Sequence, residues 1–357
     1  MKTNSTFTNF LLIALFVLLG TTLSQAVDKE KSFNVSKGNN LEVSASNGNV
    51  NISVWSKDQA YIKAFNVDED DLDKLKFEQT GSKLTVEFRG EDSDDFYLEI
   101  SIPAYLEVDV STGGGNISLN GNMTGKVEFS TGGGNVNVQD VGNKLSVSTG
   151  GGNVSAGNIT GELEISTGGG NISVADVKSK ADVSTGGGNI SIGSVGGSAD
   201  VSTAGGNLSV GKVSGSADLS TAGGNISLDG ATGNVEANTA GGNVSLKNIS
   251  GSVDANTAGG NIYAELNPTA KSKSEFNTAG GDITLVIPST AKVNIKASVY
   301  VGKKISDSDA DKLIKSDFEA TNVDFQGKQL IKKFVINGGG AEIDMNTASG
   351  KIKINKK

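Results

Sequence analysis

Apolar and polar residues alternate in short runs that return at a nearly constant interval along most of the chain. The run Ala199–Thr203 reads Ala-Asp-Val-Ser-Thr, which places Ala, Val and Thr on one side and Asp and Ser on the other. This alternation predicts a β-strand with one buried face. After Gly-Gly-Asn, a second strand carries Leu208 and Val210 on the same side, and a third apolar point, Val213, precedes a turn. The pattern therefore predicts that each unit forms two strands and a corner around an apolar interior.

A threonine ends the first strand of every unit and marks the period. These threonines are Thr112, Thr131, Thr149, Thr167, Thr185, Thr203, Thr221, Thr239, Thr257 and Thr278. They are 18 residues apart from Thr131 to Thr257, with one step of 19 before and one of 21 after. A fixed period of this size is typical of a solenoid. The fold class expected is therefore all-β: a single-chain β-solenoid, or β-helix, of about 18-residue coils.

The irregular ends predict a division into four segments. An apolar run after Lys2, closed by Ser24 and Ala26, predicts a signal peptide over residues 1–26. Residues 27–107 are expected to form a first coil and a β-rich cap with an acidic insertion, and 108–287 the regular solenoid. Residues 288–357 are expected to hold the last coils and a cap, in which the polar stretch 305–320 forms a short helix or a loop. The stretch 341–357 is expected to close the chain as a final coil.

The Gly-Gly-Asn corner and the threonine before it suggest three structural roles. Paired glycines are expected to supply positive φ. The asparagines are expected to stack amide on amide from coil to coil, as Asn171, Asn189, Asn207, Asn225 and Asn243. The inward threonines, such as Thr185, Thr203 and Thr221, are expected to form a hydroxyl ladder. A phosphate-binding loop is not indicated, because that motif needs Lys and Ser/Thr after its last glycine and then a helix.

Composition excludes several classes of function. Removing residues 1–26 leaves 30 basic and 40 acidic residues, a net charge of −10, which argues against a nucleic-acid partner. The chain has no Cys and no His, so disulfides, thiolate or imidazole metal ligands and His-dependent catalysis are excluded. No catalytic residue and no cofactor are predicted. No mature segment is long and apolar enough to span a membrane as a helix.

Carboxylates form an outward column three residues before the threonines. Early coils place Lys126, Lys144 and Lys180 beside this column, but no lysine flanks it from Asp200 to Asp254. The bare part is made by Asp200, Asp218, Glu236 and Asp254. One hypothesis is that it recruits divalent cations such as Ca²⁺, or a cationic partner. The alternative is a solvated acidic face that discourages aggregation between rods.

The pattern from residue 33 to 357 resembles the bacterial putative-adhesin family, domain of unknown function 4097. The resemblance lies in "NGNVNISV", "TAGGNISL", "YLEISIPAYLEVDVST" and "INGGGAEIDMNTASGKIKI". It implies an exported or envelope-associated β-solenoid and brings no catalytic residues. The function expected is a non-enzymatic, adhesin-like binding or structural protein of the cell envelope, periplasmic, surface-exposed or secreted, whose partner is an envelope or surface protein or glycan.

Two alternatives stay open. One is an envelope-stress or assembly partner protein that acts through its irregular ends, 56–105 and 296–335. The other is a polysaccharide-acting β-helix enzyme, because a pair of carboxylates can hydrolyse a glycosidic bond. Against the enzyme, the carboxylates recur in almost every coil instead of breaking the pattern at one place, and aromatic residues are only 5% of the chain.

Overall fold

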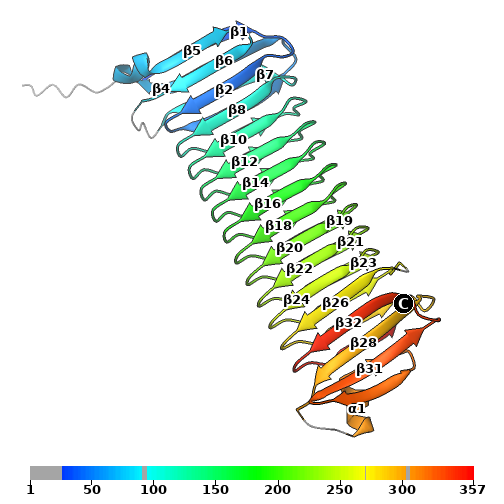
Figure 1. Cartoon of the computed structure of the whole chain (residues 1–357). Coiled ribbons are helices and arrows are strands. Elements are labelled where there is room, and N and C mark those ends of the chain that lie inside the picture. The colour runs from blue at the N-terminus through cyan, green and yellow to red at the C-terminus, as the bar shows by residue number, and fades with distance from the viewer. Residues whose placement is uncertain (1–25, 91–94, 270, 303–305) are drawn as a thin grey trace, which may run out of the picture.

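The protein is a long rod of stacked β-coils that is closed by a cap at each end (Figure 1). The computed structural model describes residues 26–357 except 91–94, 270 and 303–305. The predicted signal peptide, residues 1–26, lies outside the described residues apart from Ala26, at which the first strand begins. The β-solenoid predicted from the repeat is confirmed.

Two long sheets run along the rod, and their strands are mostly parallel. In spatial order the first sheet contains β1 (Ala26–Asn34), β4 (Gln59–Asp68), β7 (Tyr97–Pro103), β3 (Asn49–Trp55), β9 (Ile117–Asn120), β11 (Val136–Val138), β13 (Val154–Ala156), β15 (Ile172–Val174), β17 (Ile190–Ile192), β19 (Leu208–Val213), β21 (Ile226–Ala231), β23 (Val244–Ile249), β25 (Ile262–Leu266), β27 (Ile283–Ile287), β33 (Ile352–Lys356) and β29 (Ile314–Ser316).

The second sheet faces the first across the core. In spatial order it contains β5 (Leu75–Thr80), β6 (Lys83–Phe88), β2 (Asn40–Ala45), β8 (Glu107–Thr112), β10 (Val127–Thr131), β12 (Leu145–Thr149), β14 (Leu163–Thr167), β16 (Ala181–Thr185), β18 (Ala199–Thr203), β20 (Ala217–Thr221), β22 (Val235–Thr239), β24 (Val253–Thr257), β26 (Lys273–Thr278), β32 (Ala341–Thr347), β28 (Val293–Tyr300), β31 (Gln329–Ile336) and β30 (Asn322–Gln326).

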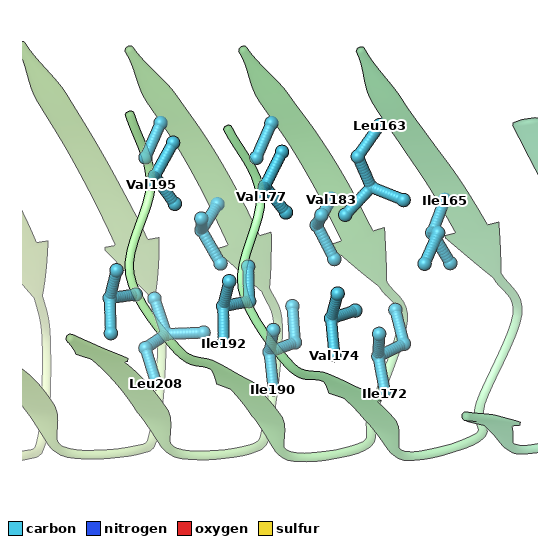
Figure 2. Close-up of a cluster of buried hydrophobic side chains, with 14 of the residues drawn as sticks. Leu163, Ile165, Ile172, Val174, Val177, Val183, Ile190, Ile192, Val195 and Leu208 are labelled. Atoms are coloured by element: carbon cyan, nitrogen blue, oxygen red, sulfur yellow. The ribbon is translucent and has the colours of Figure 1, made fainter. Parts of the chain in front are cut away.

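The repeat places identical positions of successive coils side by side. Ala181, Val183 and Thr185 of β16 pair in register with Ala199, Val201 and Thr203 of β18. Valines on the returning segment, such as Val177 and Val195, form single parallel bridges to one another. Figure 2 shows side chains from both sheets and from this returning segment pointing into a shared interior. The residues predicted to face inward are buried there.

The corner glycines are required for a reason other than the one predicted. None of them has positive φ among the described residues, so the prediction of left-handed corners is wrong. A Cβ on Gly188 would instead overlap the carbonyl oxygen of Gly170 in the preceding coil, and a Cβ on Gly206 would overlap that of Gly188. Glycine is needed at the position before the asparagine because the stacked corners approach one another there too closely for a side chain.

Both ends of the rod fold back in a way that the sequence order did not indicate. The first coil, β2 and β3, stacks directly on β8 and β9, and the segment between them adds β6 and β7 on its outer side. The last coil, β32 and β33, stacks directly on β26 and β27. It therefore does not terminate the rod, because β28 and β29 lie beyond it.

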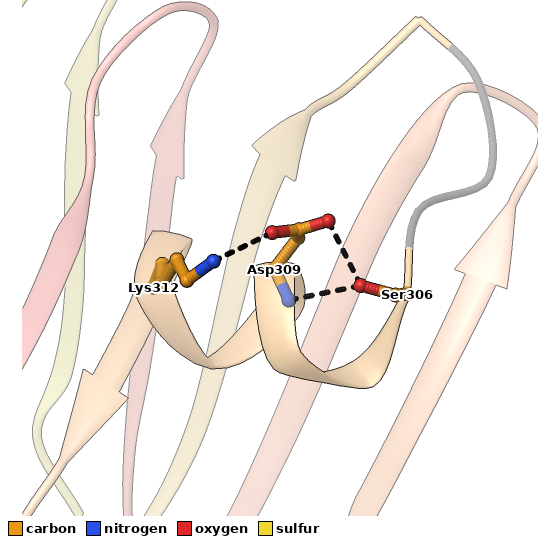
Figure 3. A network of polar contacts seen from close by, with 3 residues as sticks. All are labelled: Ser306, Asp309 and Lys312. Atoms are coloured by element: carbon orange, nitrogen blue, oxygen red, sulfur yellow. Dashed lines mark hydrogen bonds and ion pairs between the residues drawn. The ribbon is translucent and has the colours of Figure 1, made fainter.

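Two short helices belong to the caps. The 3₁₀ helix η1 (Glu69–Lys74) lies in the acidic insertion, and α1 (Asp307–Leu313) lies in the polar stretch for which a helix or a loop was predicted. Ser306 caps α1 by accepting a hydrogen bond from the Asp309 backbone N–H at 3.2 Å, and Lys312 donates to Asp309 at 2.9 Å (Figure 3). Ser306 Oγ also donates to the Asp309 carboxylate at 2.8 Å. The side-chain hydrogen bonds from Lys312 and then from Ser306 lower the pKa of the Asp309 carboxyl.

Candidate functional site

The corner asparagines form an exposed hydrogen-bonded row along one edge of the rod. The backbone N–H of Asn189 donates to Asn171 Oδ1 at 2.8 Å, and Asn189 Nδ2 donates to the same oxygen at 3.2 Å. Asn207, Asn225 and Asn243 repeat the backbone and side-chain bonds to the asparagine of the preceding coil. Each side chain thus satisfies a backbone N–H at the corner, which is a structural role.

The inward threonines act on the corner backbone and not on one another. Thr203 Oγ1 donates to the Gly188 carbonyl of the preceding coil at 3.0 Å and accepts from the Gly206 N–H at 3.3 Å. Thr185 and Thr221 make the equivalent bonds. The predicted hydroxyl ladder is therefore wrong, because each hydroxyl bonds to backbone groups of two successive glycine corners.

The carboxylate column faces solvent on the second sheet. Its early members have lysine partners: Lys126 Nζ lies 2.8 Å from a Glu128 oxygen, and Lys144 Nζ lies 3.0 Å from a Glu164 oxygen. The contact of Lys180 with Asp182 is longer, at 3.8 Å. From β18 to β24 the flanking residues are Ser198, Ser216, Asn234 and Ser252.

An open groove lies where those lysine side chains are replaced by small residues. We call it the acidic groove: it has a volume of about 490 Å³ and holds Asp200, Asp218, Glu236 and Asp254 in one row, with Lys180 and Lys273 among its lining residues. Asp200, Asp218 and Glu236 are register partners on β18, β20 and β22, and Asp254 follows on β24. Neighbouring strands are about 4.8 Å apart, so this row is a line of closely spaced like charges.

Asp218 shows the electrostatic consequence of that spacing. Partial burial raises the pKa of its carboxyl, and the carboxylates of Glu236 and Asp200 raise it further. The pKa of Asp109, at the N-terminal end of the column, is also raised by burial and then by Glu128 and Glu42. The groove therefore offers a negative field without a bound counter-charge over its middle strands.

The carboxylates do not converge on a point. Within the described ranges, no three acidic side chains come together as a set that could hold a metal ion. Ca²⁺ takes six to eight oxygen ligands, whereas a row on parallel strands presents its oxygens in a line. The arrangement fits an extended cationic partner better than a coordinated ion.

A second asparagine row was not predicted from the sequence. Beside the acidic groove, the residue before the threonine that marks the period changes from serine to asparagine, and this change was the available signal. Asn256 Nδ2 donates to Asn238 Oδ1, and Asn277 Nδ2 donates to Asn256 Oδ1, both at 2.9 Å. Asn256 also donates to Asp254 at 2.7 Å. The row therefore orients the carboxylates of the last coils.

The fold and these surfaces define a capped, parallel β-solenoid with repetitive side-chain rows on its outer faces. No helix in the described part of the chain has the length and apolar character needed to cross a membrane. The chain belongs to the Toastrack DUF4097 family, whose sequence pattern matches residues 28–229 and 182–355. The family resemblance stated from the motifs is thus confirmed.

Solved structures similar to this chain come from several bacteria. A putative adhesin from Parabacteroides distasonis is 18% identical over 74% of this chain and 98% of its own, with a TM-score of 0.36. A putative cell adhesion protein from Clostridium sporogenes is 12% identical over 93% of this chain and 100% of its own, with a TM-score of 0.22. A putative lipid binding protein from P. distasonis is 16% identical over 72% of this chain and 96% of its own, with a TM-score of 0.34. No curated protein shows a significant match.

Proposed function

We propose that the protein is a non-enzymatic binding protein of the bacterial cell envelope, exported by its leader, that holds an envelope or surface partner along its repetitive second sheet. The observation that carries the proposal is the acidic groove, in which four carboxylates stand in register on consecutive strands without a lysine between them. The carboxylates repeat with the coil instead of forming one distinct pair, so the surface supports recognition and not local chemistry.

The partner that fits this surface presents basic groups at intervals along an extended segment. One exposed ion pair contributes about 0.2–1 kcal/mol, so a single carboxylate would hold little. Several such contacts on one rigid rod act together, because the first contact raises the effective concentration of the next. Binding of this kind is expected to weaken as salt screens the charges.

A pair of coil deletions tests the proposal. Deleting 186–221 joins Thr185 to Ala222 and removes Asp200 and Asp218, whereas deleting 132–167 joins Thr131 to Gly168 and leaves the acidic groove intact. Both remove 36 residues, two full periods. We expect the first deletion, and not the second, to weaken sedimentation with isolated bacterial envelopes and binding of an oligolysine peptide.

Each other outcome has a definite meaning. If neither deletion changes envelope binding, the irregular ends carry the contact, as an assembly or stress partner would require, and the proposal is wrong. If both deletions weaken binding equally, rod length matters and the acidic groove does not. Turnover of a glycan substrate that is lost on changing one carboxylate pair would favour an enzyme. Fractionation of intact cells with protease accessibility tests the proposed export.

A further inference from the structure

A second groove lies on the outer face of the second sheet near the C-terminal cap, where β32 and β28 are neighbours (Figure 1). Its volume is about 690 Å³, within the range of small-molecule sites. It is lined mainly by Thr, Asn and Ser residues of β22, β24, β26, β32 and β28 and by the alanines that follow four of these strands, with Tyr300 and Gln329 also in the lining. None of the lining residues is charged, unlike those of the acidic groove. We call it the neutral groove.

The second asparagine row ends in the neutral groove with unused hydrogen-bonding capacity. Asn346 Nδ2 donates to Asn277 Oδ1 at 2.9 Å, but within the described chain Asn346 Oδ1 accepts no hydrogen bond. The register partner of Asn346 on the next strand is Ser298, whose side chain is too short to continue the row. The row therefore stops at a free amide oxygen that lines the groove.

Ser298 is an independent sign of an unfilled site. Its side chain points to the outer face but is only 4% exposed, and Ser298 Oγ has no hydrogen-bond partner among the described residues. An unpaired buried hydroxyl costs about 1–3 kcal/mol, so natural proteins rarely keep one without a use. Ser298 lines the neutral groove beside Asn346.

An aromatic surface completes the groove. Tyr300 lies two residues beyond Ser298 on the same face of β28, and its side chain is 48% exposed. Gln329 is the register partner of Tyr300 on β31 and adds another amide. An exposed ring next to neutral amides and hydroxyls offers both a flat apolar surface and hydrogen-bond donors and acceptors.

We propose that the neutral groove binds an uncharged saccharide, with one sugar ring stacked on Tyr300 and its hydroxyls bonded to Asn346 Oδ1 and Ser298 Oγ. A pyranose combines an apolar C–H face with hydroxyls that both donate and accept, which matches this lining. An anion would lack a positive partner there and would lie near the carboxylates of Asp254 and Glu275, which the same asparagine row holds. The inference goes beyond the proposed function, because it uses different residues and a different ligand chemistry.

Calorimetric titration of the purified protein with cellotriose, maltotriose and triacetylchitotriose tests the inference. We expect at least one of these neutral trisaccharides to bind in the millimolar range or tighter, and Tyr300→Ala to weaken that binding about tenfold or more. Tyr263→Ala is the matched control, because Tyr263 is a partly exposed tyrosine on the first sheet, outside the groove. Absence of binding by all three, or equal losses in both variants, would overturn the inference.

A second variant separates binding from folding. Ser298 makes no bond that its removal could break, so Ser298→Ala is expected to leave Tm unchanged or raise it while weakening the saccharide. A lower Tm with unchanged affinity would show a purely structural role for Ser298 and contradict the inference. The deletion of 186–221 leaves the neutral groove intact, so failure here and failure of the acidic groove are distinguished by experiment.

Discussion

At the scale of single residues, neighbouring glycines of one corner are constrained very differently. A Cβ on Gly188 would overlap the Gly170 carbonyl of the coil beneath, whereas a Cβ on Gly187 would meet no atom within 4 Å. Gly187 and Gly188 are adjacent in the same corner, and neither has positive φ. The difference in the space around the two Cβ positions therefore comes from the stacking distance between coils and not from the intrinsic conformational freedom of glycine.

This contrast gives a prediction for two adjacent substitutions. Gly188→Ala is expected to lower the free energy of unfolding by about 2–3 kcal/mol or more, because the backbone of two coils must move apart. Gly187→Ala is expected to be neutral or slightly stabilising, because alanine restricts the unfolded chain. Thermal unfolding of both variants is the measurement. Equal losses would mean that the corner needs glycine for its backbone conformation.

The threonine hydroxyl leads to a second prediction. Thr203→Val leaves the Gly188 carbonyl and the Gly206 N–H without their side-chain partner and is expected to cost about 1–3 kcal/mol. Thr203→Ser keeps the hydroxyl and loses only a methyl group, so it is the control and should cost about 1 kcal/mol. Chemical denaturation separates the two. A valine variant as stable as the serine variant would argue that the methyl group and not the hydrogen bond matters.

Asp218 gives a pH-dependent prediction. Its folded pKa is raised, so just above the unfolded value of about 4 the folded chain binds the proton more tightly than the unfolded chain does. The carboxylate is therefore unfavourable to folding at pH 7, and this penalty disappears as the pH falls through the raised pKa. Asp218→Asn is expected to raise Tm at pH 7, with a gap from the parent protein that closes towards pH 4. A gap that is constant with pH would contradict the repulsion.

At the scale of elements, the coil is the unit of stability. Each coil supplies two short strands, such as β16 and β17, whose backbone hydrogen bonds go to the coils on either side. A single coil has few partners of its own, so the array gains stability only as neighbours stack. This is why the period is so regular: a coil of different length would place every inward residue out of register.

The period can be tested directly by deletion. Removing 186–203 takes out 18 residues and joins Thr185 to Ala204, so each later residue keeps its inward or outward position. We expect this variant to fold into a shorter rod with a similar Tm. Removing only 186–194 joins Thr185 to Val195 and should prevent cooperative folding. Circular dichroism with thermal melting checks both, and equal behaviour of the two would refute the coil as the unit.

At the scale of the whole molecule, the first and last coils are built into the rod some distance from its tips. Both coils are covered by strands from elsewhere in the sequence. In the first coil β2 lies between β6 and β8, and in the last coil β32 lies between β26 and β28. The segments between these coils and the regular repeat fold over the ends and protect the exposed strand edges. Capping thus depends on contacts between residues far apart in the chain.

Removal of the last coil tests this arrangement. Truncation after Gly340 deletes β32 and β33, which separates the cap strand β28 from β26. We expect loss of soluble, cooperatively melting protein, because an apolar core end becomes exposed. Truncation after Asn355 removes two exposed lysines and the ion pair of Lys357 with Glu265 but keeps the buried Ile352 and Ile354 of β33, so it is the control. A normal Tm after loss of residues 341–357 would show that the C-terminal coil is not required for the cap.

The local periodicity of the sequence by itself determined the coil. Alternation at Ala199, Val201 and Thr203, repeated every 18 residues, leaves one arrangement in which all apolar columns are buried together. It also located the carboxylate column, because side-chain direction in a strand follows from position alone. The second asparagine row was readable in principle, from the change of Ser220 to Asn238 at one position.

Only the tertiary structure decided the features that depend on distances between coils. Four features involve atoms from segments that are separate in sequence. They are the overlap that excludes a Cβ at Gly188, the carbonyl partner of Thr203, the position of the last coil inside the rod and the unpaired hydroxyl of Ser298. A periodic sequence states which residues share a face, because that follows from strand geometry. It cannot state how closely two faces approach, because that distance is set by packing.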